Sequence, residues 1–132
     1  MLRITLRDGE KVVVNGAVLS AVGRTTLLVE NKATILRGRE VMTPEEATTP
    51  ARQLYFHTIM AYMDEENREE HQDRIVESLR KVAALLPDQE ALAATVAFAS
   101  KAAHLQFYKA LADCRQLMRL EAEALDQLDA AA

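Results

Sequence analysis

The pattern of apolar and polar positions divides the chain into two parts with different periods. Up to residue 37, short apolar runs rich in Val, Ile, Leu and Thr alternate with turn residues, which is typical of strands. All four glycines fall within the first 38 residues. We therefore predict four or five short antiparallel strands over residues 2–37, from the runs LRITLR, KVVVN, AVLSAV, TTLLVE and ATILR.

Two dipeptides, Asp8-Gly9 and Asn15-Gly16, predict hairpin turns because their residues tolerate a positive φ. The first run alternates, which predicts one apolar face and one polar face. The polar face is either a solvated sheet surface or a binding face with two arginines. The predicted core-facing residues are Leu2, Ile4 and Leu6, and the outward-facing ones are Arg3, Thr5 and Arg7.

From residue 43 onward glycine is absent and helical spacing takes over. Thr43-Pro44 followed by Glu46 resembles a capping box, and Thr49-Pro50 repeats the cap-plus-proline signal. We predict a short turn and then a helix over about residues 50–63. A second helix is predicted over about residues 67–86, with an apolar stripe of Ile75, Leu79, Val82 and Leu86.

Pro87-Asp88 ends that helix and caps the next. Because no glycine or proline occurs from Gln89 to Leu128, the pattern predicts one helix of about 40 residues, which either kinks or projects to pair with another surface. Its predicted apolar stripe is Leu92, Val96, Ala99, Ala103, Phe107, Ala110, Cys114 and Leu117.

The sequence thus predicts an α+β fold, with a small N-terminal antiparallel β module over residues 1–42 and a C-terminal antiparallel helical bundle over residues 43–132. Charge follows the same division. Residues 1–42 hold seven basic and four acidic side chains, whereas the whole chain has a net charge of −4. A basic first third on an acidic remainder indicates two functional faces.

Composition narrows the class of protein. The 132 residues contain one cysteine, so an internal disulfide is excluded and a reducing, cytoplasmic setting is expected. No apolar run approaches the ~20 residues of a membrane helix. The charged N-terminus is unlike a signal peptide.

Candidate chemistry is sparse. The chain has neither GxGxxG nor GxxxxGK[ST], and His57, His71 and His104 stand apart from any HExxH or CxxC motif. The acidic run over residues 64–73 either holds a metal or, as we prefer, is a solvated helix start. Cys114 is interpreted as a core residue. We therefore expect no catalytic residue, no metal and no cofactor.

The segment over residues 54–63 is apolar around the whole helix circumference. It is either the centre of the bundle or, in part, a contact with another protein or a second subunit. The candidate partner-binding residues are Tyr55, Phe56, Met60, Tyr62 and Met63.

Four segments together resemble the FlbT family: residues 15–18 (NGAV), 30–37 (ENKATILR) and 42–52 (MTPEEATTPAR), followed by Tyr55-Phe56. The likeness is dense over residues 2–63 and looser through the helices. It implies a regulator of bacterial flagellum biogenesis that acts on the 5′ untranslated region of flagellin mRNA, by repressing translation or promoting decay. Some members act as activators. The resemblance also implies the small flagellar protein FlaF as a partner.

A weaker resemblance to the carbon storage regulator CsrA rests on Met1-Leu2, Thr5, Arg7 and Gly9-Glu10, with a fainter likeness over residues 32–40. It implies a β dimer whose first and last strands form an RNA-binding edge. Two positions depart from that family, because Leu6 and Gly38 stand where basic residues are expected.

Both resemblances lead to one expectation, that basic side chains of the β module contact phosphates and single-stranded bases of RNA. The leading hypothesis is a flagellin mRNA-binding regulator that forms a homo-oligomer. The alternative is an adaptor or chaperone-like module for flagellin or FlaF without direct RNA contact. The candidate RNA-binding residues are Arg3, Arg7, Lys32, Arg37 and Arg39.

Overall fold

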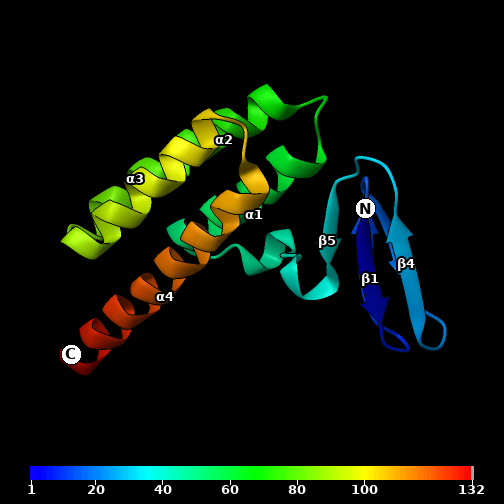
Figure 1. Cartoon of the computed structure of the whole chain (residues 1–132). Helices are drawn as coiled ribbons and strands as arrows, with labels where there is room; N and C mark the ends of the chain where they lie inside the picture. The colour runs from blue at the N-terminus through cyan, green and yellow to red at the C-terminus, as the bar shows by residue number, and fades with distance from the viewer. Residues whose placement is uncertain (132) are drawn as a thin grey trace. The chain divides into compact units, whose positions relative to one another are not determined.

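A computed structural model describes residues 1–131 and divides into an N-terminal unit, Met1–Val41, and a C-terminal unit, Met42–Ala132 (Figure 1). Strands form the first unit and helices the second, which confirms the α+β class. The change comes at Val41, one residue before the predicted end of the β module.

The N-terminal unit contains two antiparallel sheets within the described residues. One pairs β1 with β4, and the other has the strand order β3-β2-β5. Its core consists of Ile4, Leu6, Val12 and Ala21, with partly buried aliphatic side chains packed against them. The strands are β1 (Leu2–Leu6), β2 (Lys11–Val14), β3 (Ala17–Ser20), β4 (Thr25–Val29) and β5 (Ile35–Arg37), followed by the 3₁₀ turn η1 (Gly38–Glu40).

One predicted hairpin turn is confirmed and the other is wrong. Asn15 and Gly16 have φ angles of 49° and 83° and join β2 directly to β3, as a two-residue hairpin requires. The Asp8-Gly9 turn instead leads from one sheet to the other, because β1 pairs with β4 and not with β2. The Gly9 N–H donates to the Ala21 carbonyl at 2.8 Å. The first strand keeps its alternation only in part, since Leu2 is exposed.

The C-terminal unit begins with the 3₁₀ turn η2 (Pro44–Glu46), in which the Thr43 N–H donates to the Glu46 carboxylate at 3.1 Å. The helices are α1 (Pro50–Met63), α2 (Arg68–Leu85), α3 (Gln89–Ala103) and α4 (Phe107–Ala131). The first helix packs against α2 and α4, and α3 packs against α4. The predicted first and second helices are therefore present with nearly the expected bounds.

The first helix lies at the centre of this unit. Leu54 and Ala61 are completely buried, and the buried Thr58 hydroxyl donates to the Leu54 carbonyl at 2.6 Å. Its start is capped twice. The Thr49 hydroxyl accepts from the Arg52 N–H, and the carboxylate of Glu121, on α4, accepts from the Ala51 N–H at 2.8 Å. A buried acid thus satisfies a helix N-terminus, where a negative charge is favourable.

The predicted helix of about 40 residues is not continuous, because the chain breaks between α3 and α4; of the two predicted alternatives, a kink is nearer to this than a projecting helix. Helix α3 ends at Ala103 with His104 as its C-cap, and Leu105 adopts the left-handed conformation with φ 60°. The Leu105 N–H donates to the Ala102 carbonyl at 3.0 Å and the Gln106 N–H to the Lys101 carbonyl at 2.9 Å. This pair of bonds is a Schellman motif, which ends many helices and usually has glycine at the left-handed position.

The break also divides the predicted apolar stripe. Beyond it, Phe107, Ala110, Cys114 and Leu117 are buried as expected. Before it, Leu92 and Val96 are about 60% exposed, and α3 buries Ala91, Ala94 and Phe98 instead. The half of the stripe on α3 is therefore an exposed apolar row, and that part of the prediction is wrong.

Leu105→Gly is expected to stabilise the C-terminal unit by about 0.5–1 kcal/mol, because glycine adopts φ 60° without a Cβ clash. The lost side chain is more than half exposed and contributes little to packing. Urea denaturation followed by far-UV circular dichroism measures the change. Leu105→Ala is the matched control, since it removes the same exposed atoms but keeps the Cβ. An equal shift in both variants would contradict the assignment of strain to the backbone.

Candidate nucleic-acid interface

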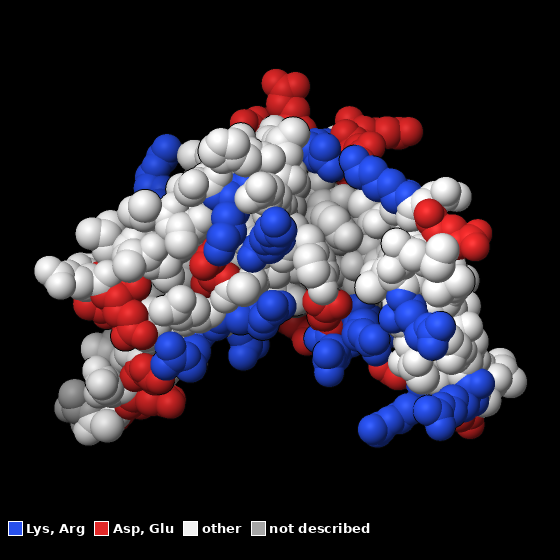
Figure 2. Space-filling view, viewed as in Figure 1, with Lys and Arg blue, Asp and Glu red and all other residues white. Residues whose placement is uncertain are grey.

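An open hollow of about 930 Å³ lies at one end of the N-terminal unit. Its lining comes from the end of β1 and the turn after it, from the residue before β4, from the end of β5 and from η1. Figure 2 shows basic side chains gathered at the end of this unit where β1 ends. The lining residues are Thr5, Leu6, Arg7, Asp8, Gly9, Glu10, Arg24, Arg37 and Arg39.

Four arginines and two acids give this lining a net charge of +2. Arg37 forms an ion pair with Glu10 at 3.6 Å. Among residues 1–131, no ion pair or hydrogen bond engages the exposed side chains of Arg7, Arg24 and Arg39. Exposed guanidinium groups converging on an open hollow attract anions and stack on planar groups.

The two acidic residues of the hollow, Asp8 and Glu10, accept hydrogen bonds from backbone N–H groups around it. A carboxylate oxygen of Glu10 accepts the Arg7 N–H at 3.0 Å while the other pairs with Arg37. Asp8 accepts the Gly23 N–H at 2.7 Å and so fixes the turn that presents Arg24. The acids therefore position the arginines as well as offsetting part of their charge.

Gly38 lies where η1 comes close to β2. A Cβ at this position would lie 3.1 Å from the Lys11 carbonyl oxygen and 3.3 Å from the Lys11 Cβ. Such contacts are tighter than packed interiors normally allow, so a larger side chain would push η1 away from β2. The absent Cβ lets Arg37 and Arg39 sit close to β2 on either side of Gly38.

The structure brings together only part of the predicted RNA-binding set. Arg7, Arg37 and Arg39 line the hollow, whereas Arg3 and Lys32 are exposed outside its lining. Arg24 lines the hollow and was missed by the sequence interpretation. Its only signal was its position after Gly23, whose φ of 73° marks a tight turn.

The predicted partner-binding residues lie on α1, where Tyr55 is only 5% exposed and the others are half-buried. The ring of Tyr62 contacts that of Tyr108, on α4, with centroids 5.5 Å apart, and the rings of Phe56 and His57 meet edge to face. These side chains therefore contribute to packing within the C-terminal unit, and any contact they make with another protein stays a prediction.

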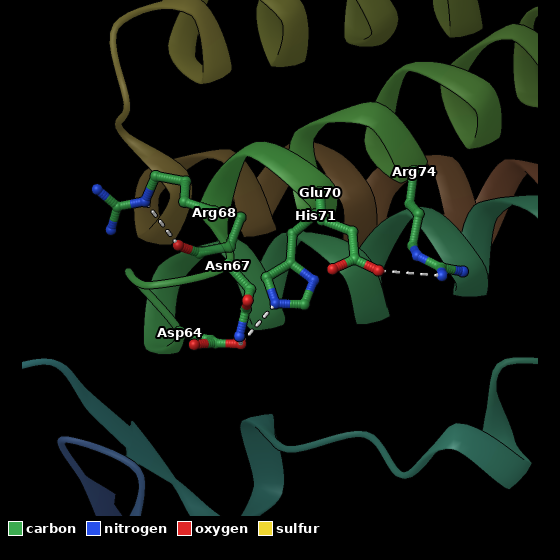
Figure 3. A network of polar contacts seen from close by, with 7 residues as sticks. Asp64, Asn67, Arg68, Glu70, His71 and Arg74 are labelled. Atoms are coloured by element: carbon green, nitrogen blue, oxygen red, sulfur yellow. Dashed lines mark hydrogen bonds and ion pairs between the residues drawn. The ribbon is translucent and has the colours of Figure 1, made fainter.

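The acidic run forms the corner between α1 and α2 (Figure 3). Asp64 accepts from the Asn67 amide at 3.0 Å and contacts the His71 ring nitrogen at 2.9 Å, and these hydrogen bonds hold the pKa of Asp64 below its usual value. The Arg68 guanidinium donates to the Ala61 carbonyl at 3.0 Å. The Asp64 carboxylate thus stabilises the connection between α1 and α2. Across the described part of the chain, no group of three or more His, Cys, Asp or Glu side chains could hold a metal ion.

Neither His57 nor Cys114 shows a catalytic arrangement. Burial and the nearby Arg74 lower the pKa of His57, which keeps its ring neutral at pH 7. Burial raises the pKa of the Cys114 thiol to about 12, so the thiolate a nucleophile needs is not formed at neutral pH. Its sulfur lies 3.9 Å from the Thr58 hydroxyl, between α4 and α1.

No helix in the described part of the chain combines the length and the apolar character needed to cross a membrane.

Comparison with known proteins gives one consistent family. A family model described as "Flagellar protein FlbT" matches residues 2–125. A probable flagellum biosynthesis repressor protein FlbT from Caulobacter sp. (strain K31) is 36% identical over 125 residues, which cover 94% of this chain and 95% of the relative. The flagellum biosynthesis repressor protein FlbT of Caulobacter vibrioides (strain ATCC 19089) is 35% identical over 94% of this chain and 89% of its own length.

A further relative, a probable flagellum biosynthesis repressor protein FlbT from Brucella abortus (strain S19), is 38% identical over 91 residues, or 69% of this chain and 60% of the relative. No solved structure matches the chain.

Proposed function

The chain belongs to the FlbT family, and on that premise we propose that it controls flagellin synthesis by binding the 5′ untranslated region of flagellin mRNA. Membership makes it a regulator of flagellum biosynthesis and not an enzyme. The proposal adds the target and the surface: the arginine-lined hollow of the N-terminal unit binds the leader in the cytoplasm, which hides it from ribosomes or exposes it to nucleases.

The observation that carries the proposal is the convergence of four arginines from three segments of the chain on one hollow. Single-stranded RNA offers this hollow both phosphates and unstacked bases, and a guanidinium group can pair with the former and stack on the latter. The lining contains no aromatic side chain, so the arginines supply the stacking surface.

Two of the three unpaired arginines, Arg7 and Arg39, give the sharpest test, because Arg37 also serves the fold through its ion pair with Glu10. Arg7→Ala/Arg39→Ala is expected to weaken binding to a flagellin 5′ leader at least about tenfold at 0.15 M salt. Two fewer phosphate contacts reduce the log–log slope of affinity against salt by about 1.4. Fluorescence anisotropy across a salt series measures both quantities.

Arg80→Ala/Arg115→Ala is the matched control, since it removes the same charge from exposed positions on α2 and α4. It should leave affinity and slope within about twofold of wild type at this salt, because neither residue belongs to the hollow and exposed charges outside the binding site are screened. A third variant, Arg3→Ala/Lys32→Ala, measures how far the RNA extends beyond the hollow. Equal losses in the hollow variant and the helix control would contradict the proposed site.

A second candidate function, a protein adaptor for flagellin or FlaF, is favoured by the exposed apolar row of α3. Leu92 and Val96 lie on it, and an apolar groove lined by Val76, Phe98 and Ala99 runs between α2 and α3. If purified wild-type protein does not bind the leader by itself, this candidate replaces direct RNA binding.

A further inference from the structure

The third strand is an exposed sheet edge that the rest of the N-terminal unit leaves uncovered. All four residues of β3, Ala17–Ser20, are exposed, with Val18 at 65% and Leu19 at 45%. The strand pairs with β2 on one side, and the strand order β3-β2-β5 places it at the edge of its sheet. Natural proteins usually protect such edges with charged residues, prolines or bulges, and β3 has none of these.

The register shows which backbone groups face outward. Val14 and Ala17 close the two-residue Asn15-Gly16 turn, and Ala21 exchanges hydrogen bonds with the Gly9–Glu10 segment at 2.8 and 2.9 Å. Ala17, Leu19 and Ala21 therefore direct their N–H and C=O groups toward β2. By alternation, Val18 and Ser20 direct theirs away from the sheet.

We propose that β3 pairs antiparallel with β3 of a second copy of this chain, about a two-fold axis that passes through Leu19. Val18 then lies opposite Ser20 of the partner subunit, and Ser20 lies opposite Val18 of the partner subunit. Each of these two pairs exchanges about two backbone hydrogen bonds, about four in all. The two sheets join into one continuous sheet with the order β5-β2-β3-β3-β2-β5.

Self-complementarity favours a second copy over an unrelated strand. The segment carries no charge, so an antiparallel copy meets no electrostatic repulsion along the strand. Leu19 lies on the same face as the buried Val12, its neighbour across β2, yet is 45% exposed at the rim of the core. Two Leu19 side chains placed directly opposite each other cover this rim. If the axis passed through Val18 instead, Ser20 would lie opposite Gly16 of the partner subunit. Gly16 belongs to the turn, so the outward-facing groups of Ser20 would have no strand to pair with.

The hollow takes its lining from residues 5–10 and from Arg24, Arg37 and Arg39. None of these residues belongs to β3, so the pairing uses backbone groups outside the hollow. An interface built around four residues per copy is small, so a dissociation constant in the micromolar range is expected.

Sedimentation equilibrium of the full chain at increasing concentration should show a monomer–dimer equilibrium. Leu19→Lys and Leu19→Glu each place like charges opposite each other at the axis and should raise the dissociation constant at least about tenfold. An equimolar mixture of the two variants should restore dimers, a result that misfolding of either variant cannot produce. A wild-type chain that stays monomeric, or charged variants that dimerise as wild type does, would overturn the proposal.

A second pair of variants tests the backbone directly. Val18→Pro removes one outward-facing N–H and should abolish dimers, because a proline is tolerated on an edge strand but cannot donate. Val18→Thr keeps that N–H and should retain the wild-type mass. Loss of dimers in Val18→Thr, or their persistence in Val18→Pro, would also overturn the pairing.

Discussion

Replacing Phe98 with alanine is expected to lower the free energy of unfolding by about 3–5 kcal/mol, because this α3 side chain is completely buried in the core. Val96→Ala, two residues earlier on the same helix, should change it by less than about 1 kcal/mol, since Val96 is 60% exposed. Urea denaturation followed by far-UV circular dichroism measures both values.

This comparison decides the rotational phase of α3. The apolar periodicity of the sequence assigns Val96 to the core, whereas the structure places it in solvent and buries Phe98. If Val96→Ala were the more damaging change, α3 would be rotated by about half a turn from the position described. The exposed row on α3 would then be core.

Glu121→Ala is expected to destabilise the chain by about 2–3 kcal/mol. The Glu121 side chain is 2% exposed and accepts the N–H of the completely buried Ala51 at 2.8 Å. Without it, that donor is left in the interior with no partner, and the first turn of α1 loses a favourable negative charge.

Two neighbouring changes isolate this effect. Glu123→Ala, on the exposed side of α4, removes only an ion pair with Arg119 and should shift stability by no more than about 0.5 kcal/mol. Glu121→Gln retains an oxygen acceptor at the same position and should cost less than Glu121→Ala. If thermal and urea unfolding rank Glu121→Ala with Glu123→Ala, the carboxylate does not cap α1.

Local signals in the sequence were sufficient for most elements. The Asn15-Gly16 turn, the Thr43 and Thr49 caps and the Pro87-Asp88 break each act within a few residues, and the structure has all four. The Asp8-Gly9 turn was misread because the partner of β1 is β4, which lies far along the chain. A dipeptide signals that the chain turns, but it does not determine which strand will pair.

The break between α3 and α4 was hidden for a different reason. A left-handed residue at a helix end is normally recognised as glycine or asparagine, and here it is Leu105. The strain at Leu105 is offset because the break allows both Phe98 on α3 and Phe107 on α4 to be buried. On one straight helix these two positions, nine residues apart, would point in opposite directions.

The sequence predicted that the candidate site lies in the basic N-terminal region, but it did not predict which basic residues line the hollow. Alternation on the first run correctly separated Arg7 from the core, but it could not distinguish Arg7, which lines the hollow, from Arg3, which does not. Arg24 reaches the hollow because it follows a turn at Gly23, and the carboxylate of Asp8, 15 residues earlier, accepts the Gly23 N–H. Only the folded register shows these contributions together.

The assembly of the hollow from residues 5–39 has a kinetic consequence. The β2–β3 hairpin closes locally and can form within microseconds, whereas β1 must wait for β4 with both of those strands between them. Arg37 and Arg39 lie on β5 and η1, and the strand order β3-β2-β5 places β5 at the edge of its sheet. Transient separation of β5 from β2 would remove Arg37 and Arg39 from the hollow while the other strands of the N-terminal unit stay folded. The rate at which β5 opens therefore sets an upper limit on the lifetime of the intact hollow.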